Sequence, residues 1–157
     1  MRKKVSILVL CAVATSFCLV GLAQEANLSE GRTLGTGMQV DFPWGGLVSG
    51  RYWFSPSVGV EGIVFIWGST NELSGSLTPR ILYKVSDTPA VDFYLATGVS
   101  FPFSPYREFV AIFSGVGGIE FSFPFAKSLA WNVEFGGAAS TEGDIMMAFG
   151  TGIHFYF

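Results

Sequence analysis

The sequence predicts an all-β protein, an eight-stranded antiparallel up-and-down transmembrane β-barrel preceded by a cleaved signal peptide. Three observations support this prediction. The 157-residue chain is 50% hydrophobic and only 13% charged, whereas ordinary soluble domains are about 25% charged. Its 16 Phe and 20 Gly residues favour strands over helices. Apolar residues also recur at every second position over most of the chain, up to the last residue, Phe157.

Residues 1–23 have the features of a secretory signal peptide. Residues 2–4 are basic, and residues 5–20 form an apolar run that is too short for a spanning helix. Residues 21–23 (Gly-Leu-Ala) provide a small-residue exit. The remaining chain is long enough for one domain, which we divide into a short lead-in at 24–31 and a barrel at 32–157.

The composition of the mature chain excludes several classes of protein. Both cysteines, Cys11 and Cys18, leave with the signal peptide, so we expect no disulfide and no Cys-based metal site. Cys18 also raises the alternative of a lipoprotein, which the bulky Phe17 before it disfavours. Nine basic residues minus the three of the leader leave six against twelve acids, a net charge of −6. This charge argues against a nucleic-acid partner.

Eight segments alternate between apolar and small or polar residues, as expected for strands with two different faces. We expect these strands at 33–42, 47–54, 58–67, 77–85, 91–99, 109–123, 129–136 and 147–157. Short turns would join them at one end (55–57, 86–90 and 124–128) and short loops at the other (43–46, 68–74, 101–107 and 139–144). Pro79 cannot donate to a ladder, so it predicts a bulge or the upper margin of the sheet.

Alternating strands fit either a soluble barrel of the lipocalin type, with an apolar core, or a membrane barrel with an apolar exterior. The polar face carries only about one ionic residue per strand, among Gly, Ala and Ser. A surface in water needs more charge, but a narrow interior needs small residues and a few ions. Aromatic residues of the apolar face also gather near the turns and the C-terminus, as in a membrane-interface belt. They are Phe54, Tyr83, Phe93, Phe121, Phe123, Trp131, Phe155 and Phe157. The membrane barrel is therefore favoured.

The charged residues of the polar face are expected to cluster inside the barrel. Counting back across the turns pairs Arg51 with Glu61, and Lys84 with Asp92. Buried ions must be paired to be tolerated. The expected lumen cluster is Arg51, Glu61, Arg80, Lys84, Asp92, Glu120 and Glu134. We interpret it as a polar plug that replaces a hydrophobic core. The alternative is a gate or a narrow ion path.

No set of residues predicts catalysis or a cofactor. His154 is the only histidine. Its position predicts an inward side chain near the barrel end, and no serine lies two residues away on its face. The Asp, Glu and His residues show no metal-ligand spacing. Gly115 to Gly118 lie within a strand and do not form a phosphate loop, so these glycines are expected to relieve crowding or to permit strand bending.

The last segment, MAFGTGIHFYF, resembles the C-terminal strand of bacterial outer-membrane barrels, whose assembly machinery recognises this end. Ile153, Phe155 and Phe157 would form that signal. The whole mature chain resembles small eight-stranded barrels such as the transmembrane domain of outer membrane protein A. The sequence shows no periplasmic peptidoglycan-binding domain, so an envelope-tethering role is not implied.

The resemblance implies a place in the bacterial outer membrane and a structural or surface-interaction role without catalysis. Outer-membrane lipid, the assembly machinery and periplasmic chaperones would be the partners of a monomer. Small outer-membrane barrels also include lipid-modifying enzymes that use Ser and His, which is a further alternative. A narrow conduit for small molecules is another, suggested by the apolar stretch Ile63, Phe65 and Trp67 on the inner face.

Overall fold

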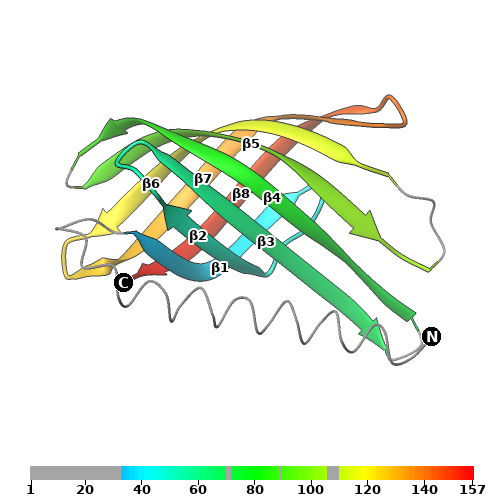
Figure 1. The fold of residues 1–157 in the computed structure, drawn as a ribbon, viewed down its shortest axis with the longest axis horizontal. Helices are drawn as coiled ribbons and strands as arrows, with labels where there is room; N and C mark the ends of the chain where they lie inside the picture. Colours follow the sequence, from blue (N-terminus) through cyan, green and yellow to red (C-terminus); the bar gives the residue numbers. More distant parts are fainter. Residues whose placement is uncertain (1–32, 70–71, 89, 106–109) are drawn as a thin grey trace.

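The computed structural model describes residues 33–69, 72–88, 90–105 and 110–157, which form a closed barrel of eight antiparallel strands (Figure 1). The strands are β1 (Leu34–Phe42), β2 (Val48–Trp53), β3 (Val58–Ser69), β4 (Glu72–Asp87), β5 (Val91–Phe103), β6 (Ile112–Phe123), β7 (Ala126–Ser140) and β8 (Ile145–Tyr156). The predicted eight-stranded antiparallel barrel is confirmed. The predicted signal peptide, the lead-in and the predicted start of the sixth strand at Phe109 lie outside the described residues. No helix in the described part of the chain is long and apolar enough to cross a membrane.

The last strand closes the barrel by pairing with the first. The β1–β8 ladder runs from Gly35 opposite Tyr156 to Phe42 opposite Phe149. The amide of Phe157 adds a hydrogen bond of 2.9 Å to the carbonyl oxygen of Leu34. Closure pairs the outer edges of the first and last strands with each other over this length, so the sheet has no outer edge strand to pair with another chain.

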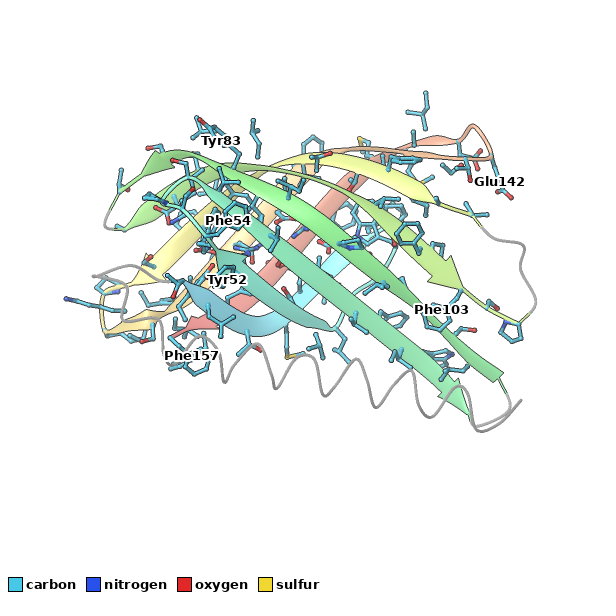
Figure 2. The ribbon with its side chains drawn as sticks, in the orientation of Figure 1. Tyr52, Phe54, Tyr83, Phe103, Glu142 and Phe157 are labelled. Atoms are coloured by element: carbon cyan, nitrogen blue, oxygen red, sulfur yellow. The ribbon has the colours of Figure 1, made fainter. Side chains whose placement is uncertain are left out.

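Exposure along β8 shows which face points outward. Phe149, Ile153, Phe155 and Phe157 are about half exposed or more, whereas the alternate residues Gly150, Gly152, His154 and Tyr156 are buried. Figure 2 shows Phe54, Tyr83 and Phe157 at the end of the barrel that carries the C-terminus. The apolar face is therefore the exterior, and the alternative of a soluble barrel with an apolar interior does not describe this chain.

The strands at the end opposite the C-terminus are longer than predicted. β3 and β4 pair up to Ser69 and Glu72, so the predicted loop at 68–74 is strand over most of its length. β5 and β7 also continue into predicted loops, to Phe103 and Ser140. The prediction relied on apolar alternation, which fades there. Backbone pairing needs only an extended neighbouring strand, so the ladder continues where the apolar alternation ends.

Pro79 lies within β4 and causes no bulge. Leu77 pairs with Phe101, and Arg80 pairs with Gly98, in one common register. The β4–β5 ladder is interrupted between these two pairs, where Pro79 has no N–H to donate. The predicted bulge at this position is therefore wrong. The predicted margin is also wrong, because strand continues on both sides of Pro79.

The glycines of β6 differ in role according to the side they face. A side chain on the inward Gly118 would collide with the ring of Tyr94 from the neighbouring strand. Gly115 faces outward, and a Cβ there would have no neighbour within 4 Å. The predicted relief of crowding therefore applies to Gly118, where the narrow interior leaves room for only one large side chain.

Candidate functional site

The interior of the barrel, which we call the lumen, is filled by side chains at both ends. At the end opposite the C-terminus, the β1–β2 connection places Trp44 inward, where it is only 6% exposed. The Ser76 hydroxyl of β4 donates a 2.9 Å hydrogen bond to the Trp44 carbonyl oxygen. At the C-terminal end, the buried Trp53, Leu82 and Tyr156 fill the interior. The polar centre lies between these two layers.

Two arginines and three glutamates form the centre of the lumen. Arg51 lies 3.1 Å from Glu61 and 2.5 Å from Glu120. Arg80 contacts Glu134 at 2.5 Å and also contacts Glu61. The side chains of all five are at most 3% exposed. Desolvation of such ions is costly, and only the geometry of several charge-assisted hydrogen bonds offsets that cost.

Neutral polar side chains extend this cluster toward the end opposite the C-terminus. The Tyr94 hydroxyl donates to Glu134 at 2.5 Å. Asn132 Nδ2 lies 3.0 Å from both the Tyr94 hydroxyl and Gln39 Oε1, and Gln39 in turn donates to Asp41 at 2.9 Å. One connected network therefore crosses the interior. Buried polar groups are tolerated when they bond to one another; here Asp41 Oδ2 and Asn132 Oδ1 have no hydrogen-bond partner among the described residues.

The structure brings together five of the seven predicted lumen charges: Arg51, Glu61, Arg80, Glu120 and Glu134. Lys84 and Asp92 form a separate pair at 3.1 Å, with the Lys84 ammonium 4.7 Å from the centre of the Trp53 ring. This pair lies nearer the C-terminal end and is slightly exposed. It contributes to the packing there, apart from the central cluster.

The register of the Lys84 pair differs from the expected one. Lys84 lies directly opposite Tyr94, and Asp92 is a diagonal neighbour. The β4–β5 ladder shifts between Lys84 and Ser86, where β4 contains a bulge. Next to the turn, Asp87 pairs with Asp92. The turn therefore lies further along the chain than the expected 86–90, and counting back across the expected turn gives the wrong partner. For Arg51 and Glu61, where β2 and β3 have no shift, counting gives the observed partner.

Sequence reasoning about the lumen charges left out the rest of the network. The residues it missed are Gln39, Asp41, Ser49, Tyr94, Asn132 and Tyr156. All of them stand at inward positions of the alternation, and the Tyr156 hydroxyl donates to Glu120 at 2.9 Å. The alternation of inward and outward residues would therefore have identified them as lumen residues. It would not have identified their hydrogen-bond partners.

The structure supplies the Ser–His contact that the sequence did not reveal. Ser49 Oγ lies 2.9 Å from His154 Nε2 and donates to Glu61 Oε1 at 2.6 Å. The same nitrogen of His154 lies 3.2 Å from Glu61. The prediction considered only serines two residues from His154 on its own face, whereas Ser49 approaches from a strand distant in sequence.

This contact lacks the geometry of a nucleophile–base pair. In a catalytic triad the base binds the hydroxyl through one ring nitrogen and the carboxylate through the other. Here serine and glutamate both meet Nε2 of His154, while Nδ1 has no hydrogen-bond partner among the described residues. Both Ser49 and His154 are completely buried. A substrate could not reach this contact without rearrangement of the lumen.

The described residues contain no group of three or more His, Cys, Asp or Glu side chains arranged to hold a metal ion. Of the proposed assembly signal, Ile153, Phe155 and Phe157 all face outward on or beside β8. Phe155 and Phe157 meet edge to face, with ring centres 5.1 Å apart. These side chains are therefore accessible from outside the barrel and separate from the lumen network.

Comparison with known proteins finds one solved structure to report. The chain is similar to CarO2 of Acinetobacter baumannii, with 11% sequence identity over 79% of this chain and 98% of that chain, and a TM-score of 0.37. No family model matches the sequence, and no curated protein matches it.

Proposed function

We propose that the chain is an integral outer-membrane β-barrel with a side-chain-filled lumen and a structural or surface-interaction role without catalysis. The observation that carries this proposal is the distribution of polarity across the barrel wall. Ion pairs occupy the interior, while large apolar side chains cover the exterior. Examples from four strands are Met38, Ile81, Leu95 and Phe113, all more than half exposed.

This distribution suits lipid and is unfavourable in water. Monomeric soluble proteins rarely expose apolar patches larger than a few hundred Å², yet here apolar side chains project outward from every strand. In a bilayer a closed barrel satisfies its backbone groups internally and presents only hydrocarbon to the lipid. The aromatic side chains near the C-terminal end, such as Tyr83, Trp131 and Phe155, would lie at the membrane interface.

The barrel would reach this membrane through secretion followed by assembly. The basic and apolar leader supports export, and the outward Ile153, Phe155 and Phe157 support recognition by the assembly machinery. Periplasmic chaperones would keep the apolar strands from aggregating before insertion. We propose a monomer whose C-terminal end faces the periplasm, surrounded by outer-membrane lipid.

A narrow conduit is the competing function. The layer around Trp44, the arginine–glutamate cluster and the layer around Trp53 succeed one another along the lumen. The conduit hypothesis relied on inner-face apolar residues, but Ile63 is completely packed and Trp67 is 71% exposed at the end of the β3–β4 hairpin. These features favour a plugged barrel over a conduit.

The test is folding and conductance of the purified barrel. We expect it to insert into lipid vesicles, to migrate faster on gels when left unheated, and to give no discrete conductance steps in planar bilayers. Stable single-channel steps would support the conduit and contradict the plug. Failure to insert into any lipid would contradict the membrane assignment itself.

A further inference from the structure

The charges inside the barrel do not balance. Among the described residues, two buried arginines and the partly buried Lys84 face five buried carboxylates: Asp41, Glu61, Asp92, Glu120 and Glu134. With His154 neutral, 3 − 5 leaves a net charge of −2 in the lumen. Uncompensated charge is costly in an interior of low dielectric constant, so the lumen favours an additional cation.

Asp41 is the carboxylate without a basic partner. The other four each lie within 3.1 Å of an arginine or lysine nitrogen, whereas no ion pair in the described part of the chain involves Asp41. Asp41 is only 4% exposed. Its Oδ1 accepts a 2.9 Å hydrogen bond from Gln39 Nε2, and its Oδ2 has no hydrogen-bond partner among the described residues. An additional cation would therefore be attracted most directly to Asp41 Oδ2.

Gly150 of β8 makes room for this carboxylate in the lumen. It pairs with Asp41 on β1 and with Glu134 on β7. A Cβ atom at Gly150 would lie 2.0 Å from Asp41 Oδ1, which is far closer than two non-bonded atoms can approach. The missing side chain therefore allows Asp41 to lean over β8.

Gly152, the next inward residue of β8, makes room for two amide oxygens. It pairs with Gln39 on β1 and with Asn132 on β7. A Cβ atom there would lie 2.0 Å from Gln39 Oε1 and 2.8 Å from Asn132 Oδ1, so both oxygens lie over the same glycine. Asn132 is completely buried, and its Oδ1, like Asp41 Oδ2, has no hydrogen-bond partner among the described residues.

We propose that these oxygens bind one calcium ion in the lumen, with Asp41 Oδ2 and Asn132 Oδ1 as ligands and Gln39 Oε1 beside them. Calcium takes carboxylate, side-chain amide and water oxygens in flexible numbers, whereas magnesium demands a near-ideal octahedron. The two charges of calcium equal the excess negative charge of the lumen. The proposal adds a ligand to the polar plug and holds for either orientation of the barrel in the membrane.

The site should bind calcium weakly. Only one of its ligands is a carboxylate, and Arg80, which is bound to Glu134 beside Gly150, repels a cation. Calcium sites of low affinity have dissociation constants of about 1 mM, and we expect a value of this order. The ion would enter as the barrel folds, because the three side chains that surround it are buried.

The experiment compares the urea unfolding midpoint of the barrel in calcium and in the chelator EGTA. The wild type is folded into phosphatidylcholine vesicles either with EGTA or with about 10 mM calcium, ten times the expected dissociation constant. Binding to the folded state alone should then raise the midpoint by roughly 0.7 M urea. Native mass spectrometry of the barrel in detergent should detect one bound calcium ion.

Two variants and a matched control locate the effect. Asp41→Asn should lose the calcium shift and, in EGTA, unfold at the same or a higher urea concentration than the wild type, because an uncompensated buried charge is gone. Gly150→Ala keeps every charge but displaces the Asp41 carboxylate, so it should also lose the shift. It replaces Asp41→Asn if that variant does not fold. Glu142→Gln makes the same kind of change at an exposed carboxylate between β7 and β8 and should keep the shift of the wild type.

A wild-type midpoint that calcium does not raise, or an equal shift in Asp41→Asn, would overturn the proposal. An equal shift with magnesium in place of calcium would overturn the choice of ion. A barrel that inserts into vesicles but shows no calcium shift refutes the calcium site alone, whereas failure to insert refutes the proposed function.

Discussion

Removing Arg51 is the most direct test of how the lumen is held together. Its guanidinium contacts Glu61 and Glu120, lies 3.9 Å from Glu134, and stands 5.2 Å from the centre of the Tyr94 ring. The variant Arg51→Ala therefore leaves Glu120 without its arginine and Glu61 and Glu134 with only Arg80. Breaking a buried ion pair by removing one partner costs about 3–5 kcal/mol, because the remaining charge is buried without compensation.

The assay is reversible urea unfolding of the barrel in lipid vesicles. With a urea dependence of about 2 kcal/mol per molar, a loss of about 4 kcal/mol lowers the unfolding midpoint by roughly 2 M. The matched control is Lys84→Met, which removes a partly exposed cation from the single carboxylate Asp92. The Lys84 and Asp92 side chains are 13% and 6% exposed, and Asp92 keeps the Thr88 amide as a donor at 3.2 Å, so the control should shift the midpoint less.

A second variant separates charge from volume. Arg51→Met combined with Glu120→Gln removes one charge of each sign and keeps most of the buried volume, so it should recover most of the lost stability. If Arg51→Ala leaves the urea midpoint unchanged, or shifts it no more than Lys84→Met does, the idea that the ion cluster replaces a hydrophobic core is wrong.

Three further outcomes follow from other parts of the barrel. Gly118→Val should destabilise folding by about 1–3 kcal/mol through overpacking against Tyr94, whereas Gly115→Val should have little effect; equal urea midpoints would contradict the crowding argument. Phe157→Ala should reduce the amount of barrel assembled in cells while leaving folding into vesicles of purified protein nearly unchanged, as measured by the unheated gel shift; an equal loss in both settings would contradict a role in recognition. Ser49→Ala should leave the acyl chains of lipid A from an overexpressing strain identical to those with the wild-type barrel; a difference between the two lipid profiles would revive the enzymatic hypothesis.

The strands and their two faces could be predicted from the sequence because both are local properties. The alternation from Met147 to Phe157 predicts which side chains of β8 share a face, since the side-chain direction in a strand reverses at each residue. The short connection between β2 and β3 also predicts the observed partner of Arg51, because turn length fixes register within a hairpin. The partner predicted for Lys84 was two residues away from the observed one, Tyr94, because the turn after β4 comes later than the expected 86–90.

Contacts across the lumen could not be predicted in this way. Arg51 meets Glu120, 69 residues later in the chain, and Ser49 meets His154, 105 residues later. Which inward side chains share a level depends on the tilt and stagger of all eight strands together. No local sequence pattern specifies this tilt and stagger, so the Ser49–His154 contact was missed and its geometry could not be judged.

The sequence by itself determined that this chain forms strands with an apolar exterior and a charged interior, because alternation and composition act residue by residue. Only the tertiary structure decided how the interior charges are shared, with Glu61 between two arginines and Tyr94 and Tyr156 as additional donors. It alone decided that Gly150 and Gly152 lie beneath the oxygens of Asp41, Gln39 and Asn132. Both features arise when the barrel closes, since closure fixes the relative heights of residues on strands that are far apart in the chain.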